Sequence, residues 1–190
     1  MGGRSSFLTM LPFEDYGVTL VCGASGYGKS VFCRRFCLHS DVMFKTKIQR
    51  IIYSYKHVEA GFTELQEKLP HIAFFPSIPD ETQLEQLTKG SDHTLLICDD
   101  AIEDLAGDNG ICRALATRLA HHLKMSVVFC SQSGQLPGKH GSIISKNVHN
   151  SIVLRSPKES YYLRNLGVQL GQHQLLKSAY KQATSEGPFS

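Results

Sequence analysis

Eight consecutive residues near the amino terminus have the spacing of a phosphate-binding loop, G-x-x-x-x-G-K-[ST]. The match is complete and comprises Gly23, Ala24, Ser25, Gly26, Tyr27, Gly28, Lys29 and Ser30. Glycines let the backbone curl so that successive N–H groups point at phosphate oxygens. The Lys29 ammonium suits the β- and γ-phosphates of a nucleoside triphosphate, and the Ser30 hydroxyl is a ligand for Mg²⁺. An apolar strand before the loop and a helical pattern after it argue against a chance glycine-rich turn.

Two aspartates, Asp99 and Asp100, directly follow the most apolar predicted strand, Thr94–Cys98. A buried strand that ends in acids delivers carboxylates to the carboxyl edge of a parallel sheet, where ligands bind. We expect Asp99 to hold Mg²⁺, directly or through water, and Asp100 to orient or polarise the attacking water. Many ATPases use the longer Glu at that second place, so Glu103 is the alternative. A helix N-cap after a core strand is the structural alternative for the pair.

A polar cluster, Ser131, Gln132 and Ser133, follows the predicted strand Ser126–Ser131. A polar residue on the strand beside the metal-binding strand can contact the γ-phosphate and sense its hydrolysis. We assign this role to Gln132. A turn made of polar residues is the alternative interpretation.

Short apolar runs alternate with longer helical patterns, which predicts the α/β class: a mostly parallel sheet with helices on both faces, as in P-loop NTPases. The expected strands are Gly17–Cys22, Arg50–Tyr55, Ile72–Phe75, Thr94–Cys98, Ser126–Ser131 and Ser151–Arg155. The expected helices are Lys29–Leu38, Gly61–Leu69, Glu81–Thr88 with Asp80 as N-cap, Gly110–Leu123, Glu159–Leu166 and Leu175–Ala183. We expect a loop at Gly134–Gly141 and an unstructured tail at Thr184–Ser190. No linker divides the chain, so residues 1–190 are predicted to form one domain.

Composition narrows the class of protein. The 190 residues carry 20 Lys and Arg against 17 Asp and Glu, a formal charge of +3 that neither shows nor forbids a nucleic-acid partner. No apolar stretch approaches the roughly 20 residues of a membrane span. The first nine residues lack the apolar core of a signal peptide, so we expect a protein of the cytosol or nucleus that is not secreted. The six cysteines form no C-x-x-C pair, and we expect reduced, structural thiols.

Beyond the phosphate-binding loop, several segments resemble the DNA-packaging ATPases of Polinton-like elements, adintoviruses and virophages, which belong to the FtsK–HerA superfamily. Arg50–Pro79 resembles one stretch of that family, and Asp99-Asp100 looks like its double aspartate. His121–Ser133 resembles its histidine pair, fourth strand and strand-end Gln. Gly138–Glu159 is similar to a K-x-x-R-x-I-S-L-N segment with the strand and turn that follow it, and Ala179–Thr184 resembles a C-terminal motif. The resemblance covers most of residues 17–184.

Two positions depart from the family pattern. Ser142 stands where the family usually carries Arg, and Ser156–Glu159 reads S-P-K-E in place of an N-P-R-D-like turn. The cation that would stabilise the transition state is therefore left open among Arg113, Arg118 and Arg155.

The resemblance implies an ATP-hydrolysing motor that moves double-stranded viral DNA into a preformed capsid, with ATP and Mg²⁺ as cofactors. It also implies a homo-oligomeric ring with nucleotide at the subunit boundary, a capsid or portal partner, no membrane, and a virion-associated protein in the host nucleus or cytoplasm. Such a motor would bind DNA phosphates without sequence preference. The basic residues expected to face DNA are Lys45, Lys47, Arg50, Lys139, His140 and Lys146. A solvated charged surface is the alternative for each of them.

Three other functions fit the loop less well. A small-molecule kinase would need an arginine-bearing lid, where the sequence offers only Lys139 and His140. A GTPase would need an N-K-x-D motif, which is absent. A nucleotide-binding scaffold or regulatory subunit without hydrolysis remains an alternative because Asp100 is short and the family's Arg is missing.

Overall fold

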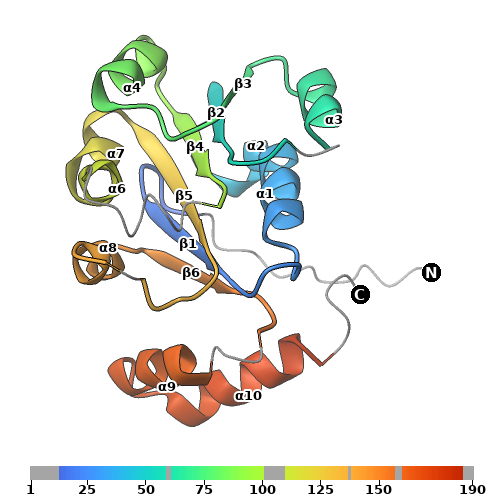
Figure 1. Ribbon diagram of the computed structural model, residues 1–190, viewed down its shortest axis with the longest axis vertical. Helices are drawn as coiled ribbons and strands as arrows, with labels where there is room; N and C mark the ends of the chain where they lie inside the picture. The colour runs from blue at the N-terminus through green and yellow to red at the C-terminus, as the bar shows by residue number, and fades with distance from the viewer. Residues whose placement is uncertain (1–12, 59–60, 101–109, 137, 157–159, 186–190) are drawn as a thin grey trace.

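The described part of the chain forms one sheet of six parallel strands with the order β3-β2-β4-β5-β1-β6 (Figure 1). The computed structural model describes residues 13–58, 61–100, 110–136, 138–156 and 160–185. The strands are β1 Val18–Cys22, β2 Arg50–Ser54, β3 Ile72–Phe75, β4 Thr94–Cys98, β5 Met125–Ser131 and β6 Asn150–Val153. Because β5 lies between β1 and β4, the loop after β1 and the acids after β4 flank the end of β5.

Helices cover both faces of this sheet, as the sequence predicts. Figure 1 shows α4, α6, α7 and α8 on one side of the sheet and α1, α2 and α3 on the other. Their bounds are α1 Lys29–Leu38, α2 Ser40–Met43, α3 Gly61–Lys68, α4 Glu81–Thr88, α6 Ile111–Ala114, α7 Ala120–His122 and α8 Gly141–Lys146. A π-helical segment, Leu115–Leu119, joins α6 to α7. Two further helices, α9 Ser160–Gln169 and α10 His173–Ala183, lie together beside β6.

Alternation of side chains along the strands divides the core into two layers. Ile52 and Leu96 pack under α4 and the α6–α7 helix, whereas Ile51 and Leu95 pack under α1 and α3. All five residues of β1 and of β4 are buried, which is typical of central strands in a sheet covered on both faces. The central strands therefore hold the residues at their carboxyl ends in fixed positions.

The start of α4 is confirmed in detail. The Asp80 carboxylate accepts a hydrogen bond from the Gln83 N–H at 2.8 Å, and the Gln83 side chain accepts one from the Asp80 N–H at 2.9 Å. This reciprocal pair is a capping box, which satisfies two N–H groups that an uncapped helix start leaves without partners.

Other expectations needed correction. The single helix expected over Gly110–Leu123 contains the π segment, in which the Ala120 N–H donates to the Leu115 carbonyl. Leucines four residues apart drift by about 40° per turn on a regular α-helix. The wider π turn keeps Leu115 and Leu119 both fully buried.

The bounds of the elements in the carboxyl-terminal half of the chain also differ from the expected ones. The expected loop Gly134–Gly141 ends where α8 begins. The sequence did not predict α8, because Ile144 is its one buried large side chain and a short helix with one such residue has no apolar periodicity. The last strand lies at Asn150–Val153 rather than Ser151–Arg155, because pairing with β1 sets its bounds. Of the expected tail, residues 186–190 lie outside the described residues. None of the helices in the described ranges combines the length and apolar character that a bilayer crossing needs.

Candidate functional site

The loop after β1 is shaped by two glycines in a left-handed conformation. Gly26 has φ 80° and Gly28 has φ 91°, a region that residues with a side chain rarely adopt. Gly28 is the N-cap of α1, and its carbonyl accepts a hydrogen bond from the Phe32 N–H at 2.8 Å. The helix therefore begins at Lys29 with its free N–H groups at the loop, an arrangement that favours phosphate.

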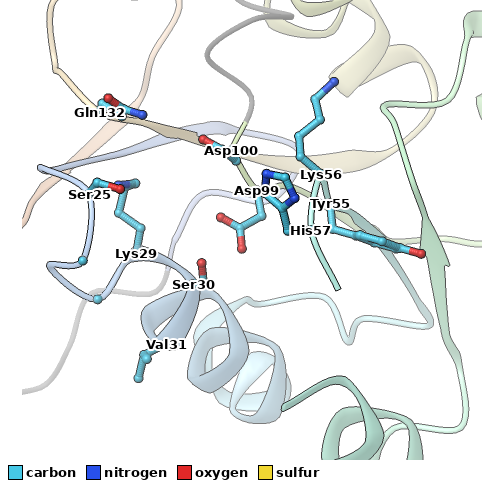
Figure 2. A pocket seen from close by; sticks show the side chains of 12 residues that line it. Ser25, Lys29, Ser30, Val31, Tyr55, Lys56, His57, Asp99, Asp100 and Gln132 are labelled. Atoms are coloured by element: carbon cyan, nitrogen blue, oxygen red, sulfur yellow. The ribbon is translucent and has the colours of Figure 1, made fainter. Parts of the chain in front are cut away.

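The predicted site residues from separate parts of the chain line one cleft of about 470 Å³ (Figure 2). Those residues are Ser25, Gly26, Gly28, Lys29, Ser30, Asp99, Asp100 and Gln132. The three remaining motif residues, Gly23, Ala24 and Tyr27, belong to the same loop but do not line the cleft. The loop after β1 and the double aspartate thus face a shared space large enough for a ligand.

Lys29 extends from the first turn of α1 back over its own loop. Its ammonium donates hydrogen bonds to the carbonyl oxygens of Gly23 at 2.9 Å and Ala24 at 3.2 Å. An ammonium has three donors, so these two bonds leave one more for a ligand oxygen. The loop carbonyls therefore hold this cation in the cleft at the place where a phosphate would meet it.

Asp99 is the best fixed carboxylate of the site. Its side chain is only 8% exposed, its Oδ2 accepts a hydrogen bond from the Tyr53 hydroxyl at 2.8 Å, and its N–H donates to the Ser54 carbonyl at 2.9 Å. Burial raises the pKa of Tyr53 far above its usual value, and the nearby Asp99 adds to the effect. The phenol therefore stays protonated and keeps donating to Asp99.

The donor set in front of Asp99 suits Mg²⁺. In Figure 2 the Asp99 carboxylate faces the Ser30 hydroxyl across the cleft. A carboxylate and a hydroxyl, completed by water and phosphate oxygens, are the hard oxygen ligands that Mg²⁺ takes. Ser30 and Asp99 could therefore hold this ion next to a bound triphosphate.

Removing the Tyr53 hydroxyl should destabilise the fold through Asp99. We expect Tyr53→Phe to lower the free energy of unfolding by about 1–2 kcal/mol, because a hydrogen bond to a buried carboxylate is lost while the ring packing stays. Urea unfolding would measure this difference. Tyr55→Phe is the matched control, since its hydroxyl has no hydrogen bond to any described residue. Equal stabilities of the two variants would contradict a structural role for the Tyr53 hydroxyl.

Two buried thiols lie behind Asp99. The Sγ atoms of Cys33 and Cys130 are 3.1 Å apart, and both side chains are fully buried. The hydrogen bond to Cys33 and burial raise the pKa of the Cys130 thiol well above its usual value. With Asp99 these thiols offer three ligand atoms within 4.8 Å of one another. A structural zinc site takes four protein ligands, so this cluster has one ligand fewer than such a site needs. None of the six cysteines forms a disulfide and all six are buried, as expected of structural thiols.

Asp100 adopts a different geometry from its neighbour. Its φ of 54° is left-handed, which an aspartate tolerates better than most residues with a side chain. In Figure 2 its side chain points toward the Gln132 side of the cleft, whereas Asp99 points toward Ser30. The two carboxylates therefore face different parts of the site. The alternative acid, Glu103, lies outside the described residues.

Gln132 stands where the sheet order places it. It follows β5, the strand between the loop-bearing β1 and the acid-bearing β4, and its side chain is exposed in the cleft. It therefore lines the same cleft as Lys29 and Asp100.

Besides Val31 on α1, sequence reasoning missed three residues that also line the cleft: Tyr55, Lys56 and His57. They follow β2, which pairs in parallel with β4 so that Ser54 stands opposite Cys98. The residues after both strands must therefore emerge at the same edge. The rule that found Asp99 from its strand end would have found Lys56 and His57 as well.

The candidate arginines do not reach this cleft in the described part of the chain. Arg118 instead binds the Glu81 carboxylate with two hydrogen bonds, of 2.7 and 2.6 Å, on the helical layer that covers the sheet. Arg113 and Arg155 are exposed elsewhere, and Ser142 lies on α8. A single chain therefore brings no described arginine to the phosphates.

The predicted DNA-facing residues form two separate groups. Lys45, Lys47 and Arg50 lie just before or at the start of β2, at the sheet edge opposite the cleft. Lys139, His140 and Lys146 lie just before or within α8, which precedes β6. Three strands separate β2 from β6, a distance of about 19 Å at the usual strand spacing. The two groups therefore lie on separate elements of the fold.

Comparisons with known proteins bear on the fold. No family model matches the chain, and no curated protein matches its sequence. Solved structures do match. B204, the DNA-packaging ATPase from Sulfolobus Turreted Icosahedral Virus, is 13% identical with a TM-score of 0.56, over 86% of this chain and 88% of that chain. B204 from Sulfolobus turreted icosahedral virus 2, in complex with ATP-gammaS, is 15% identical with a TM-score of 0.55, over 86% of each chain.

A third match extends the likeness to a different protein. The cytoplasmic domain of EssC is 18% identical with a TM-score of 0.50, over 76% of this chain and 32% of that chain. Likeness at such identities concerns the backbone, and it agrees with the parallel sheet, the loop after β1 and the acids after β4. The chain therefore has the α/β P-loop NTPase fold.

Proposed function

We propose that this chain is an ATPase that couples hydrolysis to the movement of double-stranded DNA into a viral capsid. The observation that carries the ATPase proposal is the shared cleft of Lys29, Asp99, Asp100 and Gln132. The likeness to B204, a DNA-packaging ATPase in one virus and a genome packaging NTPase in another, supports the choice of reaction and of substrate. The segments that resemble viral packaging ATPases support the same choice.

The proposed reaction assigns a task to each side chain. The N–H groups of the loop and of the first turn of α1 bind the phosphates, and the Lys29 ammonium, held by the Gly23 and Ala24 carbonyls, binds them with its remaining donor. Mg²⁺, held by Ser30 and Asp99, would neutralise charge on the phosphate oxygens. Asp100 accepts a hydrogen bond from the attacking water, which orients it for attack on the γ-phosphorus. Gln132 donates to the γ-phosphate and loses this contact after hydrolysis.

The positive charge for the transition state would come from a second subunit. No described arginine lines the cleft, whereas a cation at the γ-phosphate contributes roughly 10³–10⁵ in rate in related reactions. We therefore propose a homo-oligomeric ring with the nucleotide at the subunit boundary. The proposed partners are double-stranded DNA and a capsid or portal, in the host nucleus or cytoplasm and in association with the virion.

Phosphate release with and without duplex DNA tests this function, with the mass of the protein in solution measured on the same sample. A packaging motor should hydrolyse ATP faster with DNA. A small-molecule kinase should respond to a small acceptor instead, and a nucleotide-binding scaffold should respond to neither. Either of these last two results would contradict the proposal.

Gln132→Ala should separate binding from coupling. We expect ATP binding to remain and DNA stimulation of phosphate release to be lost, because the side chain meets only the terminal phosphate. Gln135→Ala is the control, since it is an exposed glutamine in the same connection that does not line the cleft. An unchanged response to DNA in Gln132→Ala would remove this residue from the mechanism.

A further inference from the structure

We propose that the groove between α9 and α10 binds the phosphate backbone of double-stranded DNA. The two helices form a hairpin beside β6, apart from the helical layers on the two faces of the sheet (Figure 1). The groove between them has a volume of about 700 Å³. The choice of duplex DNA as the ligand rests on the proposed function, whereas the preference for a polyanion rests on the groove alone.

Every charged residue of the hairpin is basic. Residues 160–185 contain Arg164, Lys177 and Lys181 and no aspartate or glutamate. All three side chains are exposed and line the groove, and none forms an ion pair within the described residues. His173 lines it as well. A concave surface with three cations that have no ion pair among the described residues attracts a polyanion and repels a basic partner.

The spacing of the basic side chains on α10 suits a regular chain of phosphates. His173, Lys177 and Lys181 recur every four residues and therefore share one face of α10. The row they form is about 12 Å long at the rise of an α-helix. Along the duplex axis, one DNA strand rises about 3.4 Å per phosphate, so a row of this length spans several phosphates. Arg164 faces the row from α9, on the opposite side of the groove.

Neutral donors complete the lining. The Ser160 hydroxyl lines the groove, and Tyr161 beside it is 59% exposed. Hydroxyl groups of Ser and Tyr contact DNA phosphates together with Arg and Lys, and such contacts carry no sequence information. The groove should therefore bind duplex DNA of any sequence.

The hairpin is anchored beside the phosphate-binding loop. The Tyr180 hydroxyl of α10 donates to the Leu154 carbonyl at 3.2 Å and accepts from the Ser156 N–H at 2.9 Å. Leu154 directly follows β6 and packs so closely on the loop that a Cβ added to Gly23 would lie 2.9 Å from the Leu154 Cβ. One residue thus contacts both the loop and the hairpin, so bound DNA would lie on the same edge of the sheet as the nucleotide.

Binding of a fluorescent 30-base-pair duplex to the full chain, measured by anisotropy without nucleotide at several salt concentrations, tests the proposal. We expect Lys177→Gln/Lys181→Gln to bind at least about tenfold more weakly near 0.1 M salt, with a salt slope smaller by about two contacts. Lys68→Gln/Lys89→Gln removes the same charge from the end of α3 and from the residue after α4, and this variant should bind like the unmodified protein. Thermal unfolding of each variant confirms that it folds.

Several outcomes would overturn the proposal. Equal affinity of the groove variant and the unmodified protein would do so, and so would equal losses in both double variants. Displacement of DNA by polyglutamate as readily as by unlabelled duplex would point to an acidic protein partner. If the groove variant changed its oligomeric mass but kept its affinity for DNA, the groove would bind a second copy of this chain instead.

The test of the groove and the test of the proposed ATPase function can fail independently of each other. Basal phosphate release is measured without DNA, and the affinity for DNA is measured without ATP. DNA binding that depends on Lys177 and Lys181 in a protein without ATPase activity would leave the groove assigned and the motor refuted. DNA-stimulated hydrolysis with an unaffected groove variant would give the reverse result.

Discussion

Lys29→Ala should reduce ATP hydrolysis by at least about 10²–10³, the loss typical when a charge or donor aimed at the transition state is removed. ATP binding should weaken as well, because the ammonium meets the phosphates of the ground state too. In the structure this ammonium is already held in the cleft by the Gly23 and Ala24 carbonyls, so little reorganisation precedes its contact with phosphate. Phosphate release and binding of a fluorescent ATP analogue would measure the two effects.

Lys89→Ala is the control for this loss, since Lys89 is an exposed lysine at the end of α4 and does not line the cleft. The Lys29→Ala variant also loses two hydrogen bonds to loop carbonyls, so its unfolding curve must be compared with that of the unmodified chain. Hydrolysis at a normal rate by a folded Lys29→Ala protein would mean that the loop after β1 does not serve the reaction.

Asp100→Asn should leave ATP bound and slow turnover by about 10²–10⁴, the usual contribution of a positioned general base. Asparagine keeps the shape of the side chain and tolerates the left-handed φ of 54° at this position, so the backbone should not change. Asp99 keeps its hydrogen bond from Tyr53 in this variant. The variant therefore removes one carboxylate while the proposed Mg²⁺ ligands stay in place.

Substitutions of two other acidic residues serve as controls for Asp100→Asn. Asp41→Asn changes an exposed aspartate on α2 and should have no effect on either binding or turnover. Glu103→Gln tests the alternative acid. Normal turnover in Asp100→Asn together with a loss in Glu103→Gln would transfer the role to Glu103.

The parts of the site that could be predicted from the sequence are those with a local signal. The loop is a contiguous motif, and Asp99 and Gln132 each follow an apolar strand, so the common edge of a parallel sheet brings them together. The start of α4 could be predicted for the same reason, since Asp80 and Gln83 are three residues apart.

The remaining features depend on contacts between distant residues. Tyr53 reaches Asp99 over 46 positions, and Tyr180 reaches Leu154 over 26, with no pattern to mark either pair. Both α9 and α10 were expected, but the groove between them depends on how the two helices pack against each other, which the sequence does not indicate. The π segment before α7 likewise depends on the sheet that Leu115 and Leu119 contact.

A crystal structure of the protein with Mg²⁺ and a non-hydrolysable ATP analogue tests the central claim most directly. We predict the triphosphate in the loop after β1, with Lys29 within hydrogen-bond distance of its β- and γ-phosphates. The metal should lie between Ser30 and Asp99, and Asp100 should face the γ-phosphate. A triphosphate bound elsewhere, or a metal ion in this loop without Asp99 near it, would contradict the account.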